Sequence, residues 1–470
     1  MKKLLSFFMA FVIFLFSFTL PAVSSFAEES DEFEQALYTV DGTVYADAYM
    51  LINLDDEDFP VVAQKNQDKR KFPASLTKMV TAMVTINNVS DLSEKTKVSK
   101  AAIMALANTG ASVAGLKPGD ELTVEQLLYL TMVQSACDAC QVLAEYVAGS
   151  VDQFVKMMNI WVKSIGCENT NFVNPDGLHD DNHYSTAADM AKIAIKAMED
   201  STFEKIATTP RYEYNGRTFV HTNFMMDKFH VSYYYEYASG IKTGSTSQAG
   251  YCLVTQASKD GYNYLAVVMD SPLKMLKGYD TKCSFIDART LFEWAFKSLK
   301  YSTVVNGDDV IAEVPVNNGK DADTVQLVAQ EDITTLVPVS LDPSAVMVQP
   351  VDMPQELDAP VKKGSAVCEA NIIYADTVIA KTTLVASKDV ELSTFLKIMN
   401  SLKKFFGSKI VLTVLVLLIL GVAAYIAFFT IKLQKDKKRI AEKRRRQQEL
   451  DDKLNGYYDD NYIEPPKRRK

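Results

Sequence analysis

Hydrophobic residues follow two different spacings between residues 34 and 300. Three runs rich in β-branched and aromatic residues predict strands, at residues 48–55, 250–258 and 262–270. Three other runs repeat apolar residues every three or four positions and predict helices, at residues 75–86, 123–133 and 186–198. Thr186 and Asp189 have the spacing of a capping box at the start of the last helix. We therefore expect a mixed domain of helices and strands over residues 28–300.

The pattern changes after about Tyr301, where short apolar runs alternate with Gly, Asn, Asp and Pro. These runs have the length and composition of strands, and they lie at residues 323–330, 333–341, 366–375 and 377–387. Several short strands in series predict a small all-β domain over residues 301–390. Residues 391–409 then mix apolar and basic residues at helical spacing, as an amphipathic juxtamembrane helix does.

Residues 410–431 form a run of 22 residues without a charge. A helix of that length rises about 33 Å, which is enough to cross a hydrocarbon core of about 30 Å. A basic segment follows at once, and the positive-inside rule keeps such a segment in the cytoplasm. We therefore expect a transmembrane helix over residues 410–431 and a basic cytoplasmic tail over residues 432–470.

A second apolar run lies at the N-terminus, where it begins after Lys2 and Lys3 and extends to about Leu20. Small residues and an acidic stretch follow it, so residues 1–27 are typical of a secretory signal peptide cut after Ala27. The alternative is an N-terminal anchor that is retained. Export agrees with the C-terminal signals and predicts a single-pass protein of the cell membrane, with its catalytic part outside the cytoplasm.

The two sides of the expected span differ in charge. Residues 432–470 hold 14 Lys and Arg against 8 Asp and Glu, whereas residues 28–431 hold 34 against 51. The basic tail suits anionic lipid headgroups. A nucleic-acid partner is not expected, because the tail has no aromatic or Gly-rich recognition module near it. The acidic outer part would need a local cation to bind an anionic substrate.

Six cysteines are spread over the exported part of the chain. Export permits disulfides, but six cysteines in so long a segment do not form a disulfide framework. Cys137 and Cys140 make a single CxxC pair without a second pair, which disfavours a zinc site. We expect most of the six to be free, buried thiols.

The pattern Ser-x-x-Lys occurs four times, with its serine at positions 75, 239, 271 and 401. Only Ser75 opens a long apolar helix, with Pro73 just before it, where a first-turn proline is favourable. Residues three apart share a helix face, so the Lys78 amine can reach the Ser75 hydroxyl. Unpaired N–H groups at the helix N-terminus can hold a developing oxyanion. Lys78 must be neutral to act as a base, and burial and a second nearby cation would both lower its pKa from about 10.4.

Lys242 is the candidate for that second cation. It begins the sequence Lys-Thr-Gly before a predicted strand, and Gly244 lets a ligand approach the backbone closely. A third element is Ser135 in the sequence SACDAC, which follows an apolar helix. The chain therefore presents Ser-x-x-Lys, then Ser-x-Cys 60 residues on, then Lys-Thr-Gly a further 107 residues on.

These three motifs resemble Ser-x-x-Lys, Ser-x-Asn and Lys-Thr-Gly of the low-molecular-mass penicillin-binding proteins, the D-alanyl-D-alanine carboxypeptidases. Residues 72–84, 170–194 and 240–254 also look like signature stretches of that family. The resemblance covers roughly residues 35–300, and a following β-rich domain with membrane attachment is a family habit as well. It implies an α+β fold with a serine β-lactamase/transpeptidase-like catalytic domain, in which an antiparallel sheet is combined with a helical subdomain.

The resemblance also implies an activity. A serine-type D-Ala-D-Ala carboxypeptidase removes the terminal D-alanine from peptidoglycan stem pentapeptides and so regulates cell-wall crosslinking. Ser75 would attack the peptide bond and carry the acyl group, Lys78 would take its proton, and Ser135 would relay a proton to the leaving D-alanine. Water would then hydrolyse the acyl-enzyme, and a β-lactam would acylate Ser75 and stay. The mechanism asks for no metal and no cofactor.

The remaining site residues would bind the substrate. Lys242 and Thr243 would hold its terminal carboxylate, Gly244 would leave room for it, and the backbone N–H of Ser245 would complete the oxyanion hole with that of the nucleophile. Cys137 departs from the family pattern, which usually has Asn there. A thiol is a weak substitute for an amide as donor and acceptor, so we expect activity to survive, at a reduced rate. Cys137 as the nucleophile is disfavoured.

Two alternative functions remain open. A β-lactamase on the same fold would need a positioned carboxylate for deacylation, and Glu168 lies at a suggestive distance after Ser135, but its neighbours do not match the usual pattern. The extra β domain and the span favour a wall-facing peptidase. A non-catalytic, membrane-held protein that binds wall peptides is the alternative of a different class, and the intact nucleophile and base positions disfavour it.

The sequence HDDNH offers a metal site as a further hypothesis. His179 and His183 lie four positions apart, with Asp180 and Asp181 between them. A turn signal, Asn-Pro-Asp-Gly, precedes them, and no third ligand is evident in the sequence. We therefore expect a loop before the capped helix rather than a metal site.

Overall fold

The computed structural model describes residues 37–56 and 60–459, and its chain divides into two compact units. The first unit extends to Val304 and also takes in residues 334–347 and 372–380. The second unit holds residues 305–333, residues 348–371 and the chain from Lys381 onward. The predicted signal peptide, residues 1–27, lies outside the described residues.

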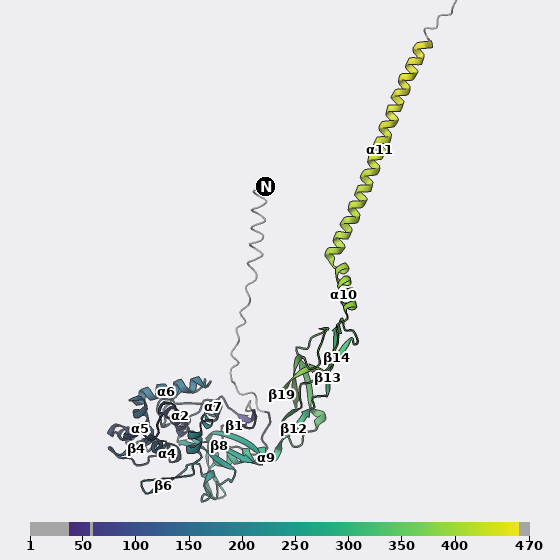
Figure 1. Ribbon diagram of the computed structural model, residues 1–470. Coiled ribbons are helices and arrows are strands. Elements are labelled where there is room, and N and C mark those ends of the chain that lie inside the picture. The colour runs from purple at the N-terminus through teal and green to yellow at the C-terminus, as the bar shows by residue number, and fades with distance from the viewer. Residues whose placement is uncertain (1–36, 57–59, 460–470) are drawn as a thin grey trace, which may run out of the picture. The chain divides into compact units, whose positions relative to one another are not determined.

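A five-stranded antiparallel sheet forms the centre of the first unit (Figure 1). Its spatial order is β2-β1-β9-β8-β7. The strands are β1 (Ala48–Asn53), β2 (Val61–Lys65), β7 (Ala238–Thr246), β8 (Gly250–Lys259) and β9 (Tyr262–Ser271). The three strands predicted from composition are confirmed as β1, β8 and β9. β7 lies at an edge of the sheet, so one side of its backbone is free to face other groups.

Alternate residues of these strands enter two separate cores, as the period of two in a strand requires. In β9, Leu265, Val267 and Met269 pack among the helices of the first unit. Tyr264 and Val268 lie on the other face, against α9 (Cys283–Ser298). The sheet is therefore buried on both faces, which explains the uninterrupted apolar runs in the middle of β8 (residues 251–254) and β9 (residues 264–269).

The helical subdomain covers the first of these faces. Its elements are η1 (Ala74–Thr77), α2 (Lys78–Asn88), α3 (Lys100–Met104), α4 (Val124–Val133), α5 (Cys137–Ala148), α6 (Val151–Ser164), α7 (Ala187–Met198) and α8 (Ser201–Ala207). α2 is buried from its first residue because α4, α5, α6, α7 and α8 all pack around it. The three predicted helices are confirmed as η1 with α2, α4 and α7.

The predicted capping box at α7 forms only in part. The Thr186 hydroxyl accepts a hydrogen bond from the Asp189 backbone N–H at 3.0 Å. The Asp189 carboxylate does not return to the cap; it accepts instead from the Asn169 N–H at 2.9 Å and from the Thr170 hydroxyl at 2.5 Å. Asp189 therefore ties α7 to the preceding loop, a partner that spacing along one helix does not indicate.

Short elements complete the first unit. They are β3 (Lys95–Lys97), β4 (Glu121–Thr123), β5 (Arg211–Tyr214), β6 (Arg217–Val220), η2 (Phe224–Met226), β10 (Leu273–Leu276) and β11 (Tyr279–Lys282). The strands form three antiparallel pairs, β3 with β4, β5 with β6, and β10 with β11.

The all-β region predicted after residue 301 is present. Its elements are β12 (Leu299–Val305), β13 (Val310–Asn317), β14 (Thr324–Ala329), β15 (Ile333–Pro338), η3 (Pro343–Ala345), β16 (Met347–Val351), β17 (Leu357–Asp358), β18 (Ala366–Tyr374) and β19 (Thr377–Ala386). Six of the strands form one sheet in the order β16-β18-β19-β14-β13-β17, and β12 pairs with β15. The chain has no helix longer than a single turn between α9 and α10.

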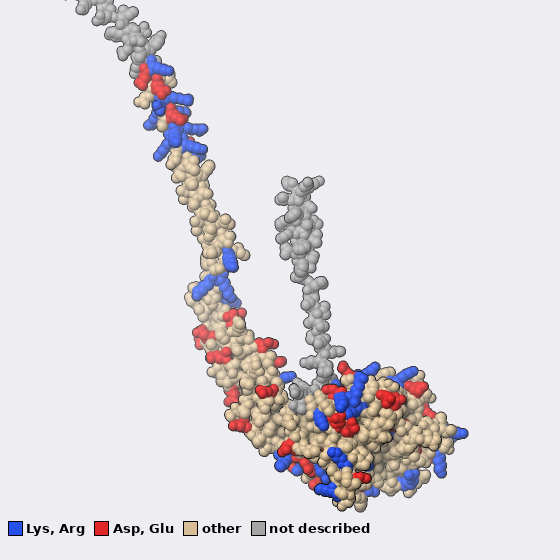
Figure 2. All heavy atoms as spheres, turned by 180° about the vertical axis from the view of Figure 1, so that it is seen from behind, with Lys and Arg blue, Asp and Glu red and all other residues tan. Residues whose placement is uncertain are grey.

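Two helices follow, α10 (Thr394–Gly407) and α11 (Lys409–Asp459). Among the described residues, α11 is the one helix long and apolar enough to cross a membrane. Figure 2 shows its uncharged stretch with blue Lys and Arg atoms at both ends. The helix continues through the basic segment to Asp459, although the sequence analysis assigned no structure there.

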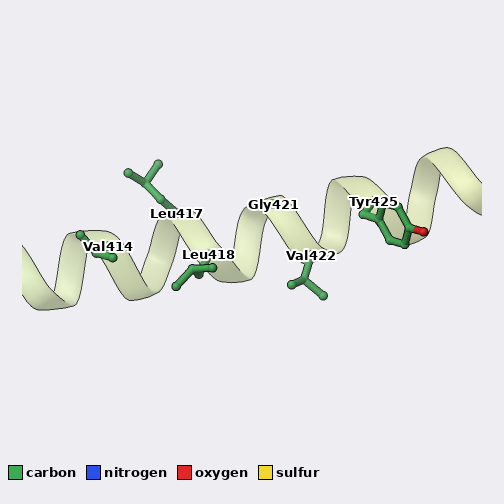
Figure 3. A pocket seen from close by; sticks show the side chains of 6 residues that line it. All are labelled: Val414, Leu417, Leu418, Gly421, Val422 and Tyr425. Atoms are coloured by element: carbon green, nitrogen blue, oxygen red, sulfur yellow. The ribbon is translucent and has the colours of Figure 1, made fainter.

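The apolar stretch of α11 carries a shallow hollow around Gly421 (Figure 3). Its lining consists of residues of the same helix, namely Val414, Leu417, Leu418, Gly421, Val422 and Tyr425. The missing side chain of Gly421 accounts for the hollow, and its lining is almost entirely apolar. The candidate active site lies in the first unit, around Ser75.

Candidate active site

Ser75 lies in η1, the single 3₁₀ turn that precedes α2. Pro73 caps this turn, and its carbonyl accepts from the Leu76 N–H at 3.1 Å. A 3₁₀ helix has about three residues per turn, so side chains at positions i and i+3 lie directly above one another. Lys78 is the first residue of α2, and its Nζ donates to the Ser75 Oγ at 2.8 Å. The structure thus brings the predicted pair together, through a tighter turn than the α-helix expected.

The Lys78 amine has two further partners, each from a different element. It donates to the Sγ of Cys137 at 3.4 Å, at the start of α5. It also donates to the backbone carbonyl of Asp176 at 2.5 Å, in the loop before α7. The Lys78 side chain is completely buried, whereas Ser75 is partly exposed. A ligand can therefore reach the hydroxyl while the amine stays shielded from solvent.

The turn Asn174-Pro-Asp-Gly-Leu178 supports the backbone of the serine. The Asn174 side chain closes the turn, because it accepts from the Gly177 N–H at 2.7 Å and donates to the Leu178 carbonyl at 2.8 Å. Gly177 has φ +82° and lies against η1 so closely that a Cβ there would be 1.9 Å from the Ala74 carbonyl oxygen. The sequence analysis recognised this turn but not its contact with Ser75.

The Ser-x-Cys motif lies where α4 passes into α5. Ser135 adopts φ +59°, a left-handed conformation that costs free energy in a non-glycine residue. Asp138, one residue beyond Cys137, is buried, and its carboxylate accepts backbone N–H groups of Ala114 at 2.9 Å and Leu116 at 3.0 Å. Asp138 thereby fixes the segment before β4 to the start of α5. The sequence carries no signal for this role, because the partners of Asp138 lie 22 to 24 positions earlier in the chain.

The Lys-Thr-Gly motif lies on β7, at the free edge of the sheet. Lys242 is completely buried, and the Thr243 hydroxyl donates to the hydroxyl of Thr222 at 2.6 Å. A Cβ at Gly244 would be 2.8 Å from the Pro73 carbonyl and 3.0 Å from the Ser75 nitrogen. β7 therefore packs directly on η1, and Ser245 follows at an exposed position beside the serine. Thr222 is a further neighbour that the sequence did not reveal.

The two lysines share one low-dielectric pocket. Burial lowers the pKa of Lys242 well below its ordinary value, and the charge of Lys78 lowers it further. The pKa of Lys78 is raised instead, because interactions with Cys137, Cys140 and Asp176 outweigh the lowering by burial. Burial raises the pKa of both thiols, so they are neutral near pH 7. The lowering of the pKa that we expected for Lys78 is therefore wrong for that residue and is found at Lys242 instead.

The remaining residues singled out by the sequence lie apart from this cluster or support it indirectly. All six cysteines are free, and five of them are buried, as expected. Glu168 is exposed to solvent. The ring nitrogen Nε2 of His183 contacts the Thr77 hydroxyl at 2.7 Å, and its Nδ1 accepts from the Val173 N–H at 3.2 Å. Within residues 37–56 and 60–459, no three or more His, Cys, Asp or Glu are grouped as metal ligands.

The buried histidines make stability depend on pH. Burial lowers the pKa of His183 from 6.5 to about 4 and that of His221 to about 3. The unfolded chain therefore binds protons below pH 6.5 that the folded protein excludes, and the free energy of unfolding should fall as the pH falls from 6.5 toward 4. The slope is at most about 1.4 kcal/mol per pH unit for each histidine. Urea unfolding at several pH values measures it.

Two substitutions separate this effect from the titration of carboxylates. A His183→Gln protein should lose part of the decline between pH 6.5 and 5. A His179→Gln protein should keep it, because His179 and its partner Asp181 are exposed, with side chains 26% and 93% accessible. An unchanged pH dependence in His183→Gln would show that His183 does not carry this proton linkage.

Comparisons with known proteins agree with this geometry. The family model for D-alanyl-D-alanine carboxypeptidase matches residues 34–272, and that for the C-terminal domain of penicillin-binding protein 5 matches residues 300–392. D-alanyl-D-alanine carboxypeptidase DacF of Bacillus subtilis is 30% identical over 342 residues, which cover 72% of this chain and 84% of DacF. DacA of Escherichia coli is 29% identical over 383 residues, 78% of this chain and 90% of DacA.

A solved structure extends the similarity to three dimensions. Penicillin-binding protein 5 of Haemophilus influenzae superimposes with a TM-score of 0.56 at 28% identity, and the match covers 75% of this chain and all of that protein. The family model alone spans half of the chain, including all three motifs. The chain therefore belongs to the D-alanyl-D-alanine carboxypeptidases, the low-molecular-mass penicillin-binding proteins.

Proposed function

We propose that Ser75 is the nucleophile with which this protein removes the terminal D-alanine from peptidoglycan stem pentapeptides. Enzymes of this family process the D-Ala-D-Ala end of peptidoglycan and are acylated by β-lactams. The observation that carries the assignment is the 2.8 Å hydrogen bond from the Lys78 Nζ to the Ser75 Oγ, in a pocket that buries the amine and leaves the hydroxyl accessible.

Proton transfer follows from the same contact. The Ser75 oxygen bonds to the carbonyl carbon of the penultimate D-alanine while its proton passes to the free-base form of Lys78. The C–N bond then breaks, and Ser135 relays a proton to the leaving amine. Water hydrolyses the resulting ester and regenerates Ser75. Ser135 is the candidate for the relay because it is buried at the start of the segment that brings Cys137 to the Lys78 amine.

The residues that bind the substrate in this proposal lie mainly on β7. The Lys242 amine and the Thr243 hydroxyl hold the terminal carboxylate. Lys242 is thus the local cation that an otherwise acidic domain needs to bind an anionic substrate. The backbone N–H groups of Ser75 and Ser245 hold the oxyanion. The close approach of Gly244 to Ser75 supports this pairing, because a Cβ at Gly244 would lie 3.0 Å from the Ser75 nitrogen and Ser245 is the next residue of β7.

Cys137 is expected to be dispensable for acylation. Its thiol is neutral, and the proton path runs through Ser75, Lys78 and Ser135. A Cys137→Ala protein should keep its second-order rate of acylation by a fluorescent penicillin within about tenfold of wild type, since one weak hydrogen bond is lost. Cys137→Asn, which restores an amide, should be at least as fast as wild type. Abolished acylation in Cys137→Ala would give the thiol a role in the reaction.

The apolar helix α11 is the candidate membrane anchor, and we infer a single-pass arrangement around it. Residues 1–27 direct export, residues 410–431 cross the membrane, and the basic tail stays in the cytoplasm near anionic lipids. α10 contributes an amphipathic segment without acidic residues. Protease protection of the tail in right-side-out vesicles tests this orientation.

The activity is tested with the purified full-length protein in detergent. A pentapeptide ending in D-Ala-D-Ala should yield free D-alanine, and a penicillin should form a slowly released adduct that maps by mass spectrometry to the peptide containing Ser75. Prompt turnover of the penicillin would favour a β-lactamase. Binding of the pentapeptide without release of D-alanine would favour a non-catalytic wall-binding protein.

A further inference from the structure

The candidate active site contains two buried amines, and a carboxylate acts on the pKa of one of them, Lys78. Among the described residues, the groups that shift the pKa of Lys242 are Lys78, Cys140 and Cys137. Those that shift the pKa of Lys78 include the carboxylate of Asp176. The two amines are thus equally buried but differ in the charge that faces them.

Asp176 is held rigidly in this position. It is 1% exposed, and its backbone carbonyl accepts from the Lys78 Nζ at 2.5 Å, so the carboxylate of the same residue lies near the amine without being hydrogen-bonded to it. The carboxylate accepts from the Gln141 Nε2 of α5 at 2.7 Å and from the Leu178 N–H at 3.0 Å. Both partners are neutral donors, which orient the carboxylate without cancelling its charge.

The other titratable groups that face Lys78 supply no negative charge near neutral pH. α5 contributes Cys137 and Cys140, whose pKa values are raised by burial. The loop before α7 contributes, besides Asp176, His183, whose pKa is lowered to about 4 and which is therefore neutral. β7 contributes Lys242, which is a base. Among the described groups that act on the pKa of Lys78, the Asp176 carboxylate thus remains as the source of negative charge, near the amine but not bonded to it.

We propose that Asp176 is a positioning residue for the acyl transfer, whose fixed carboxylate balances the charge that Lys78 gains when it accepts the Ser75 proton. The proposal rests on the function assigned to Ser75 and Lys78 above. The protein supplies one carboxylate, for Lys78, and the substrate supplies the second, for Lys242. Each amine then has its own counter-ion when the Ser75–carbonyl bond forms.

The assignment of one carboxylate to each lysine predicts a distinct effect on the pH dependence of the acylation rate. A nearby carboxylate favours the protonated amine, so it raises the pH at which Lys78 becomes a free base, and it stabilises the ammonium that forms in the transition state. Removing the charge should therefore have two opposite effects. The midpoint of the pH–rate profile should move to lower pH, and the rate on the plateau above it should fall.

The test uses full-length protein and the second-order rate of acylation by a fluorescent penicillin between pH 5 and 10. Asp176→Asn keeps one oxygen acceptor for Leu178, and the Gln141 amide can turn to accept from the new Nδ2, so the shape of the site is preserved. We expect the acid-side midpoint to fall by about one pH unit and the plateau to fall about tenfold, the scale of one neighbouring charge. Asp176→Glu should keep the wild-type midpoint.

Asp138→Asn is the matched control, since Asp138 is also buried and adjacent to the site but its carboxylate binds backbone N–H groups of residues 114–116. It should lower the rate without moving the midpoint. If Asp176→Asn also slows acylation with an unmoved midpoint, Asp176 has only a structural role and the proposal is wrong. Failure of the wild-type protein to release D-alanine would instead contradict the proposed function, and the midpoint could still be measured with the penicillin.

Discussion

A protein in which Ser75 is replaced by Ala is expected to release D-alanine from a pentapeptide at least about 10⁴-fold more slowly than wild type, because loss of a nucleophile removes the covalent route entirely. It should also form no stable adduct with a fluorescent penicillin. The fold should be unaffected, since the hydroxyl is partly exposed and its recorded partner is the Lys78 amine. Release of D-alanine and gel fluorescence measure the two losses.

Ser401→Ala provides the matched control. Ser401 and Lys404 also form a Ser-x-x-Lys pair, but they lie on α10, where both are exposed. That protein should react with pentapeptide and penicillin as wild type does. A Ser75→Ala protein that still trimmed the pentapeptide would contradict the assignment of the nucleophile, whatever its reaction with penicillin.

The second prediction with a large expected effect is a loss of stability and of acylation rate when Gly177 is replaced by Ala. Gly177→Ala should lower the free energy of unfolding by about 1–2 kcal/mol through its positive φ, and by roughly 1–3 kcal/mol more through overlap with backbone. The new Cβ would lie 1.9 Å from the Ala74 carbonyl oxygen and 2.9 Å from the Ser75 nitrogen, neither of which belongs to a flexible side chain. η1 must therefore shift. A displacement of about 1 Å at the nucleophile costs on the order of 10²-fold in rate.

Gly278→Ala is the control that separates the cost of steric overlap with the backbone from the cost of a positive φ. Gly278 has φ +84°, close to the +82° of Gly177, but a Cβ there meets nothing within 4 Å. It should cost only about 1–2 kcal/mol and leave acylation unchanged. Urea unfolding and the acylation rate should be measured for both proteins. If Gly177→Ala and Gly278→Ala lost equal amounts of stability and of acylation rate, the positive φ alone would account for the effect, and the turn at Gly177 would not support Ser75.

Much of the site could be predicted because its chemistry is local or carried by recognisable motifs. Ser75 and Lys78 are three apart, and any helical turn there brings them together. Lys242 and Gly244 could be assigned to a strand because the residues after them are strand-like. The resemblance to a known family then connected the motifs, which lie 60 and 107 residues apart and which no periodicity relates.

The supporting residues could not be found in the same way. Asp176 touches Lys78 across 98 positions, and Asp138 binds a loop 22 to 24 positions earlier. In the sequence, Asp176 was one residue of a turn, and Asp138 was the polar position of a CxxC pair. Thr222 carried no signal at all, because its hydroxyl matters only through the Thr243 hydroxyl beside it.

The sequence by itself determined the alternation of strands and helices, the apolar helix after residue 409 and the reactive pair at positions 75 and 78. These features depend on neighbours within one or two turns, and periodicity records such neighbours directly. Only the tertiary structure decided that a 3₁₀ turn presents the serine, that Gly177 and Gly244 pack against its backbone, and that the Asp176 backbone carbonyl binds the Lys78 amine. These are contacts between distant segments, and packing of the whole domain selects them.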